Sequence, residues 1–144
     1  MSKKIVIFTD GASKGNPGPA SIGAIIKDDA GAVLATVSEA IGVNTNNVAE
    51  YTAILRALQE ARRFDADIVD CYLDSELVVR QMTGVYKIKD ARLSKLAQQI
   101  RTLCEQTPSR LVKFSHVYRE HNHEADALAN AALKPSKKLG TNRA

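Results

Sequence analysis

Two apolar runs that each lead into an aspartate constrain the fold of this chain more than any other feature of its sequence. Ile5–Phe8 is apolar at successive positions, which is typical of a strand covered on both faces, and Asp10 follows it. Ile68–Leu73 is a second β-rich run, and Asp74 comes directly after it. Ligands of open α/β sheets bind at the carboxyl ends of strands, so the two aspartates converge if these strands are neighbours. Taken alone, each aspartate fits a turn or helix-capping role better than a ligand role.

The other segments predict a mixed sheet with helices packed on it. Ser21–Ile26 and Ala32–Ile41 are typical of strands joined by a hairpin, so the chain opens as an antiparallel meander. The full order is strand, strand, strand, helix, strand, helix, helix, strand, helix. It predicts an α/β fold with a five-stranded mixed sheet, in which two further strands join the antiparallel three. The later segments are a capped amphipathic helix after Thr45, a helix from Ser75 to Met82, a helix at Arg92–Gln106, a strand at Leu111–Tyr118 and a helix at Glu124–Leu133.

The length and composition fit one globular domain. The chain has 144 residues, of which 44% are hydrophobic and 25% charged. We expect a single domain over residues 1–133 and a basic, flexible tail over residues 134–144, where polar residues and helix breakers gather. There is no apolar run of about 18 residues and no apolar stretch behind Lys3 and Lys4, so we expect a cytoplasmic protein with no membrane partner.

Charge divides the sequence into an acidic and a basic half. Up to Asp74 there are 7 Lys and Arg against 10 Asp and Glu, and from Ser75 onward there are 13 against 6. A basic surface attracts polyanions such as nucleic acid, whereas gathered carboxylates suggest a cation site. Modest charge excesses also serve solubility alone, so composition does not decide between these interpretations.

Glu50 adds a third carboxylate, which helical spacing turns toward protein. It lies on the same row of its helix as Ala53, off the polar stripe that includes Arg56. A carboxylate turned toward protein needs a partner, because burying an unpaired charge is costly. Asp126 is ambiguous, since an acid in the first turn of a helix is stabilised by the helix dipole alone.

Carboxylates that gather in one place have a characteristic chemistry. They repel one another unless cations neutralise them, and hard oxygen ligands select Mg²⁺ or Mn²⁺ over zinc. Two such ions about 3.5–4 Å apart activate a water, hold a phosphate and stabilise the leaving oxygen of an in-line displacement. The carboxylates therefore indicate phosphodiester hydrolysis.

Four motifs resemble those of ribonuclease H, type 1, and they keep the order and separation found in that family. The first is Phe8–Pro19 (FTDGASKGNPGP), and the second is Thr45–Glu50 (TNNVAE). The third is Tyr72–Ser75 (YLDS), and the fourth is His121–Asn130 (HNHEADALAN). The resemblance covers the chain from about Lys4 to Leu133. It implies a ribonuclease H-like fold and a metal-dependent endonuclease that cuts the RNA strand of RNA–DNA hybrids.

The resemblance also implies the site residues. It assigns four carboxylates to one site for Mg²⁺ or Mn²⁺, with two ions expected when substrate is bound: Asp10, Glu50, Asp74 and Asp126. It implies that amide groups meet 2′-hydroxyls and minor-groove edges of the RNA strand, and that Thr45 helps to hold a phosphate of the DNA strand. Plain helix capping by Thr45 and Asn46 can coexist with this binding. The implied substrate-binding residues are Gly11, Asn16, Thr45, Asn46, Asn47 and Ser75.

The chain departs from the longer members of that family between Met82 and Arg92. Those members insert a helix and a basic loop, the handle, which grips the hybrid, whereas this sequence has only a short connection. Lys87, Lys89 and Arg92 could take over part of that binding, and an ordinary solvated connection is the alternative. Weak substrate affinity or low processivity is the expected consequence.

Two histidines lie on the segment before the last helix, His121 and His123. Many members of the family place a histidine on this loop, where it assists proton transfer or product departure. The unperturbed pKa of histidine, about 6.5, suits proton exchange near neutral pH. Either residue could act, with His123 nearer in sequence to Asp126, and exposed residues without a role are the alternative.

Three other functions compete with a ribonuclease. A non-catalytic nucleic-acid-binding module of the same fold is the first, and the intact four-carboxylate set argues against it. An aspartyl-nucleophile phosphatase needs a second aspartate two residues after Asp10, where Ala12 stands. Cysteine catalysis needs a positioned thiol, but Cys71 lies in a strand pattern and Cys104 on an apolar helix face, as expected of buried thiols. We expect a monomer with no obligatory protein partner.

Overall fold

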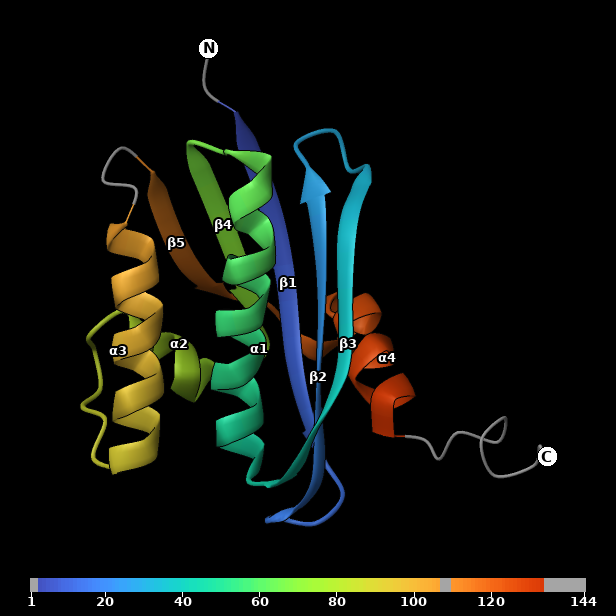
Figure 1. Ribbon diagram of the computed structural model, residues 1–144, viewed down its shortest axis with the longest axis vertical. Helices are drawn as coiled ribbons and strands as arrows, with labels where there is room; N and C mark the ends of the chain where they lie inside the picture. The colour runs from blue at the N-terminus through green and yellow to red at the C-terminus, as the bar shows by residue number, and fades with distance from the viewer. Residues whose placement is uncertain (1–2, 107–109, 134–144) are drawn as a thin grey trace, which may run out of the picture.

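A five-stranded mixed sheet forms the centre of the molecule (Figure 1). The computed structural model describes residues 3–106 and 110–133, so the predicted tail lies outside the described residues. The strand order is β3-β2-β1-β4-β5, with β1 to β3 antiparallel and β4 and β5 parallel to β1, which confirms the predicted sheet. The strands are β1 (Lys4–Ser13), β2 (Gly18–Asp28), β3 (Val33–Asn44), β4 (Ile68–Leu73) and β5 (Leu111–His116).

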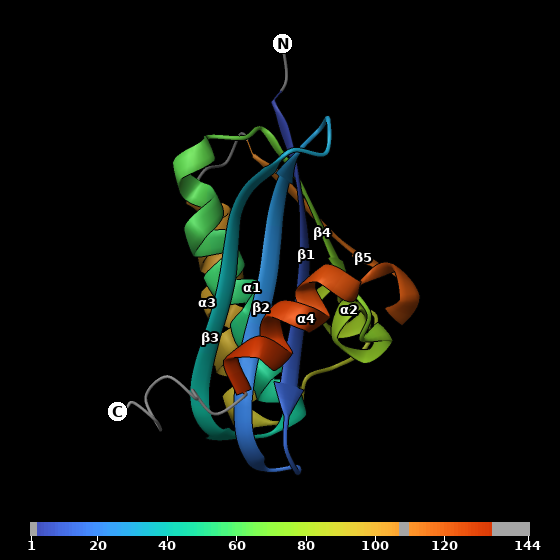
Figure 2. The ribbon, with the colours of Figure 1, turned by 90° about the vertical axis from the view of Figure 1, so that its right-hand side faces the viewer.

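Helices pack on both faces of this sheet. Helices α1 and α3 lie together on one face, and α4 crosses the other face over β1, β2 and β3 (Figure 2). None of the helices in the described ranges is long and apolar enough to cross a membrane. The helices are α1 (Asn46–Ala61), α2 (Glu76–Met82), α3 (Ala91–Glu105) and α4 (His123–Leu133), with short 3-10 helices η1 (Arg62–Phe64) and η2 (Arg119–His121).

The core fills the space between the sheet and α1 with α3. Ile5 and Ile7 of β1 are fully buried on that side. Val6 and Phe8, on the other side, are only partly buried. The expectation that this run is covered on both faces is therefore wrong for the second face, because α4 crosses that face beside Gly23, farther along the sheet.

The sheet divides at the two aspartates. The parallel pairing of β1 with β4 ends at Thr9 and Leu73. Beyond that point β1 continues beside β2 as far as Ser13, so Asp10 lies inside a strand and not in a turn. Asp74 leaves the sheet at the same level. The parallel register thus makes Asp10 and Asp74 the first residues beyond the paired segment, on neighbouring strands.

The strands of the meander are longer than their hydrophobic pattern predicts. Strand β2 begins at Gly18 instead of Ser21, and β3 ends at Asn44 instead of Ile41. Gly18 and Asn44 are partners in the register, so backbone pairing continues after the apolar alternation has ended. The last strand is shorter than predicted and ends at His116.

Gly23 lets α4 lie directly on β2, and this contact can be tested. A Cβ at Gly23 would stand 2.3 Å from the Ala125 carbonyl oxygen and 2.4 Å from the Ala129 amide nitrogen. Helix backbone cannot rotate aside, so Gly23→Ala should destabilise the fold by about 2–3 kcal/mol, the upper range for overpacking. Chemical denaturation measures the loss, and hydrogen exchange should show α4 amides exposed.

Gly31→Ala is the control for this prediction. A Cβ at Gly31 would meet nothing within 4 Å. Because its φ is +92°, alanine there would destabilise the fold only through the left-handed backbone conformation, by about 1–2 kcal/mol. Exchange in α4 should not change in this variant. Unchanged α4 protection in Gly23→Ala would contradict the close packing.

Candidate metal and nucleic-acid site

Three carboxylates from three different elements meet where β1 and β4 part. Asp10 comes from β1, Asp74 follows β4, and Glu50 lies in the second turn of α1. One oxygen from each lies within 4.8 Å of the other two. In the described ranges no other group of three or more Asp, Glu, His and Cys side chains comes together in this way. The spacing suits a shared cation.

Gly11 makes the approach of Glu50 possible. A Cβ at Gly11 would stand 2.5 Å from the backbone of Ala49 and of Glu50, so α1 rests directly on β1 at this point. The Gly11 amide also donates a hydrogen bond to Asp10 Oδ1, at 3.0 Å. This residue, which the resemblance implies for substrate binding, therefore also positions two of the carboxylates.

Asp126 adds a fourth carboxylate to this group, from the opposite face of the sheet. It lies in the first turn of α4, the helix that Gly23 admits close to β2. The three other carboxylates and Asp126 share one cavity of about 340 Å³. Its helix position alone left Asp126 ambiguous and the resemblance assigned it to the site, and the structure places it in this cavity. The residues that line the cavity are Asp10, Gly11, Asn46, Glu50, Asp74, Ser75, Arg119 and Asp126.

The electrostatics of the cluster favour a bound cation. Burial, the charge of Asp74 and the adjacent Asp126 carboxyl together raise the pKa of Asp10 to about 8. Burial, followed by the charges of Asp10 and Asp74, raises the pKa of Glu50 well above its ordinary value. Glu50 Oε1 is buried and has no hydrogen-bond partner in the described part of the chain. These oxygen donors fit a hard divalent cation, whose positive charge would offset the repulsion between the carboxylates.

The predicted substrate-binding residues surround the first turns of α1 and α2. Asn46 and Ser75 line the cavity beside Gly11. Asn16, in the turn after β1, accepts a hydrogen bond through Oδ1 from the Asn46 amide at 3.0 Å. Asn47 is partly buried and does not line the cavity. The turn after β1 is thus tied to the residue that opens α1.

Two of these residues also cap helices. Thr45 Oγ1 accepts a hydrogen bond from the Val48 amide at 3.2 Å, and Ser75 Oγ accepts one from the Val78 amide at 3.3 Å. Capping of α1 by Thr45, which the sequence predicted, is confirmed. Because Ser75 also lines the cavity, capping does not remove it from the site.

Two residues at the site were not predicted from the sequence, although Asn122 lies inside the His121–Asn130 motif. Arg119, on η2, lines the cavity, and its charge opposes the rise in the pKa of Glu50. Asn122, directly before α4, is 1% exposed and donates a hydrogen bond to Asp74 Oδ2 at 3.1 Å. An isolated arginine and an asparagine in a polar segment form no periodic pattern, so neither could be recognised from spacing.

The remaining candidates lie on the surface. His121 ends η2 and His123 begins α4, and both are exposed and outside the cavity lining. Lys87 and Lys89 are exposed on the connection between α2 and α3, which holds no helix. The short connection predicted by the sequence is therefore confirmed, and the roles of these four side chains stay predictions.

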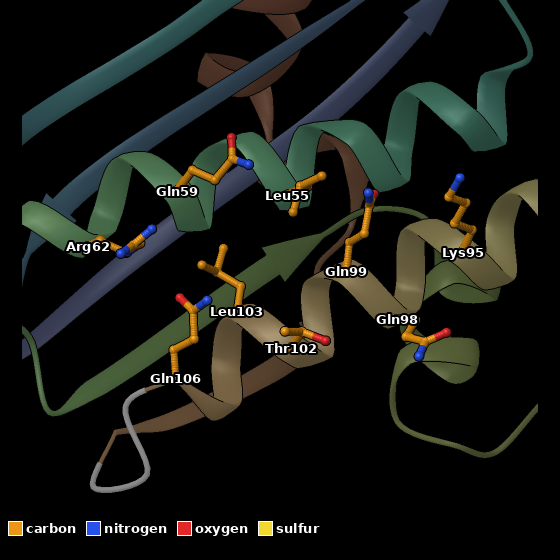
Figure 3. A pocket seen from close by; sticks show the side chains of 9 residues that line it. All are labelled: Leu55, Gln59, Arg62, Lys95, Gln98, Gln99, Thr102, Leu103 and Gln106. Atoms are coloured by element: carbon orange, nitrogen blue, oxygen red, sulfur yellow. The ribbon is translucent and has the colours of Figure 1, made fainter.

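Two other features of the described chain offer no comparable chemistry. A larger groove, of about 540 Å³, lies between α1 and α3, and its lining of glutamines, cations, two leucines and a threonine holds no carboxylate (Figure 3). Cys71 and Cys104 are free thiols, the first buried and the second partly buried. Burial raises the pKa of the Cys71 thiol to about 12, so it does not ionise as a nucleophile at neutral pH.

This sheet order, with an acidic cavity at its centre, defines a ribonuclease H-like α/β protein. Residues 8–132 match the family described as "Reverse transcriptase-like". Ribonuclease HI of Halobacterium salinarum is 39% identical over 130 residues, which are 90% of this chain and 64% of that protein. Ribonuclease H of Chlorobium phaeovibrioides is 31% identical over 147 residues, which are 93% of this chain and 98% of that protein. The chain belongs to the ribonuclease H family.

Solved structures agree with this membership. LC11-RNase H1 in complex with an RNA/DNA hybrid superposes with a TM-score of 0.84 at 43% identity, over 90% of this chain and 96% of that chain. RNase H1 from Halobacterium salinarum gives a TM-score of 0.84 at 38% identity, over 90% and 97%. The bifunctional protein Rv2228c of Mycobacterium tuberculosis is 44% identical over 131 residues. The chain spans only 35% of the length of that protein.

The raised pKa of Asp10 predicts how stability depends on pH without metal. The unfolded chain releases this proton near pH 4, whereas the folded chain holds it to about pH 8. The free energy of unfolding should therefore fall as pH rises from about 4 to about 8. Asp10→Asn removes this titration, so in EDTA its stability should fall less, and at pH 8 it should equal or exceed that of wild type.

Denaturation at several pH values, with EDTA and with Mg²⁺, measures this effect. Mg²⁺ should stabilise wild type, because a ligand that binds only the folded state raises its stability, and it should stabilise Asp10→Asn much less. Asp90→Asn is a matched control at an exposed helix cap outside the cluster. A wild type that is more stable than Asp10→Asn in EDTA at pH 8 would argue against carboxylate repulsion.

Proposed function

We propose that this chain is a metal-dependent endonuclease that hydrolyses the RNA strand of RNA–DNA hybrids. The observation that carries the proposal is the convergence of Asp10, Glu50 and Asp74 within 4.8 Å at the part of the sheet where β1 and β4 separate. Membership of the ribonuclease H family supports the reaction. The hybrid bound by LC11-RNase H1, which is 43% identical, supports the substrate.

The carboxylates would hold Mg²⁺ or Mn²⁺, with two ions expected in the substrate complex. Bound divalent ions of this kind supply the Lewis acid that activates a water and stabilises the leaving oxygen. Burial raises the pKa values of Asp10 and Glu50, and a bound cation would favour their charged forms. Asp74 and Asp126 approach from β4 and α4, so the donors surround the cavity. Their fixed backbones keep the oxygen atoms in place before the cations bind.

The other residues of the cavity would recognise the hybrid. Asn46 offers a side-chain amide of the kind that meets a 2′-hydroxyl, the group that distinguishes RNA from DNA, and Gly11 lines the same cavity. Asn16 orients the Asn46 backbone from outside the cavity. Arg119 brings a guanidinium to the rim, where it can donate to a phosphate oxygen. Thr45, at the start of α1, would face a phosphate of the DNA strand.

A non-catalytic module of the same fold is the second candidate. A module that only binds nucleic acid gains nothing from four carboxylates in one cavity, since they repel phosphate. The unpartnered Glu50 Oε1 also favours a bound cation. A part in proton transfer for His121 or His123 stays a prediction, as do the single domain, the monomeric state, the lack of an obligatory protein partner and the cytoplasmic location.

Removal of one carboxylate charge tests the nuclease. Asp10→Asn, Glu50→Gln and Asp74→Asn should each lower hybrid cleavage by at least about a hundredfold, beyond the 10–100-fold usual when only a group that supports a ligand is lost. Labelled RNA–DNA hybrid, RNA–RNA, DNA–DNA and single-stranded RNA are incubated with Mg²⁺ or Mn²⁺, and the product ends are analysed. Circular dichroism confirms that each variant is folded.

The outcomes separate the two candidates. Metal-dependent cleavage of the hybrid in its RNA strand supports the nuclease. Hybrid binding without cleavage under any metal supports the binding module. Retention of most wild-type activity in Asp10→Asn or Asp74→Asn at saturating metal would overturn the site assignment.

The exposed lysines of the α2–α3 connection test how the hybrid is held without a handle. Lys87→Ala and Lys89→Ala should each weaken binding of hybrids of any sequence, because a phosphate contact carries no base information. Each should also reduce the slope of log affinity against log salt by about 1. Titration of a labelled hybrid in Ca²⁺ at several salt concentrations measures both effects.

Lys3→Ala provides the matched control, since it removes the same charge from an exposed position. Lys3 directly precedes β1, at the end of that strand away from Asp10. It should leave the affinity at low salt nearly unchanged. If the connection variants behave like this control, the connection is an ordinary solvated loop.

A further inference from the structure

We propose that Asn122 is a positioning residue that orients the Asp74 carboxylate for cation binding. The inference rests on the proposed metal-dependent function, which assigns Asp74 to the cation site. Asn122 lies between η2 and α4 and is 1% exposed, although the segment around it is polar and exposed. Burial of a polar side chain costs free energy, and hydrogen bonds made within the protein offset this cost.

Both amide protons of Asn122 are used at the acidic site. Nδ2 donates to Asp74 Oδ2 at 3.1 Å and to the Thr9 carbonyl oxygen at 2.9 Å. Both partners accept hydrogen bonds and cannot donate one. The amide nitrogen must therefore face them, because the opposite orientation would set Oδ1 against two other oxygens.

The position of these partners explains why a side chain is needed there. Thr9 is the last residue of β1 that pairs with β4, and Asp74 is the first residue after β4. Beyond that pair the two strands have no backbone hydrogen bonds to each other. Asn122 bridges them with one amide group, so it links the strand that carries Asp10 to the carboxylate of Asp74.

The same residue also begins the helix that carries Asp126. The Asn122 carbonyl oxygen accepts a hydrogen bond from the Asp126 amide at 3.1 Å. Asn122 is thus hydrogen-bonded to Asp74, to the backbone of Asp126 and to the residue that precedes Asp10. Three of the four carboxylates are therefore placed relative to one buried residue. A change in its side chain would therefore alter the relative placement of these three carboxylates.

An ordinary helix cap does not account for these contacts. A capping asparagine uses its side-chain oxygen to accept from an amide of the first turn. Asn122 Oδ1 is buried and has no partner in the described part of the chain, whereas the nitrogen makes both bonds. The side chain therefore acts as a donor to the site, and a hydrogen bond to a carboxylate is among the strong ones.

Loss of this donor should weaken cation binding. Groups that orient a metal ligand typically contribute 10–100-fold to metal affinity or activity. Asn122→Ala removes the donor, and Asn122→Leu removes it while keeping a side chain of similar shape, in case the smaller residue fails to fold. Ser21→Ala is the matched control, because buried Ser21 ties α4 to the sheet through the Ala129 carbonyl and touches no carboxylate.

Two measurements on the full chain test the proposal. Isothermal titration calorimetry with Mn²⁺, without nucleic acid, gives the dissociation constant of the cation. Hybrid cleavage over a range of Mg²⁺ gives the half-saturating concentration. Both should rise 10–100-fold in Asn122→Ala and Asn122→Leu and stay near wild type in Ser21→Ala, while circular dichroism and thermal unfolding in EDTA show folded proteins.

Each other outcome contradicts the proposal or separates it from the nuclease function. Wild-type values in a folded Asn122 variant overturn it, and so does an equal rise in Ser21→Ala, which would indicate general loosening of α4. If wild type binds Mn²⁺ but cleaves no hybrid, the nuclease function fails and calorimetry alone decides the role of Asn122. A wild type that binds no Mn²⁺ overturns both.

Discussion

The contact of helix backbone with strand backbone at two glycines is the constraint on which the site depends. At Gly11 the backbone of α1 comes so close to β1 that a Cβ would stand 2.5 Å from it, and at Gly23 α4 comes equally close to β2 on the other face. The first contact brings Glu50 to the sheet, and the second brings Asp126. Because Asp10 and Gly23 are partners across β1 and β2, both helices converge on one point of the sheet.

Backbone packing also explains how the fold tolerates so much negative charge. The β1–β4 register fixes Asp10 and Asp74, and the two helix contacts fix the other carboxylates, so none of them can move away to relieve repulsion. Burial, together with this repulsion, raises the pKa values of Asp10 and Glu50. The buried apolar core between the sheet and α1 with α3 offsets this cost. The fold itself therefore holds the carboxyl groups close together, and a bound cation would favour their charged forms without being needed to build the site.

The sequence predicted the order of the elements and the cation site better than the surroundings of that site. Apolar periodicity identified all five strands, and helical spacing predicted that the Glu50 side chain faces protein. Periodicity could not show that β1 runs past Asp10, because backbone pairing leaves no apolar signal once the alternation ends. It also could not reveal Asn122 or Arg119, whose importance depends on contacts with residues far away in the chain. Such contacts follow from topology, which a local pattern does not contain.

The acidic and basic halves of the sequence lie at different places in the structure. Three of the four carboxylates precede Ser75, whereas Arg119, Lys87 and Lys89 follow it and lie at the rim or on the exposed connection. A phosphate that approaches a metal-free cavity meets four carboxyl groups and one guanidinium, and the carboxyl groups that are ionised repel it at short range. Bound cations would add the positive charge that attracts it. In the proposed reaction, cation binding and hybrid binding are therefore thermodynamically linked: each must strengthen the other by the same factor, because the coupling free energy between two sites is reciprocal.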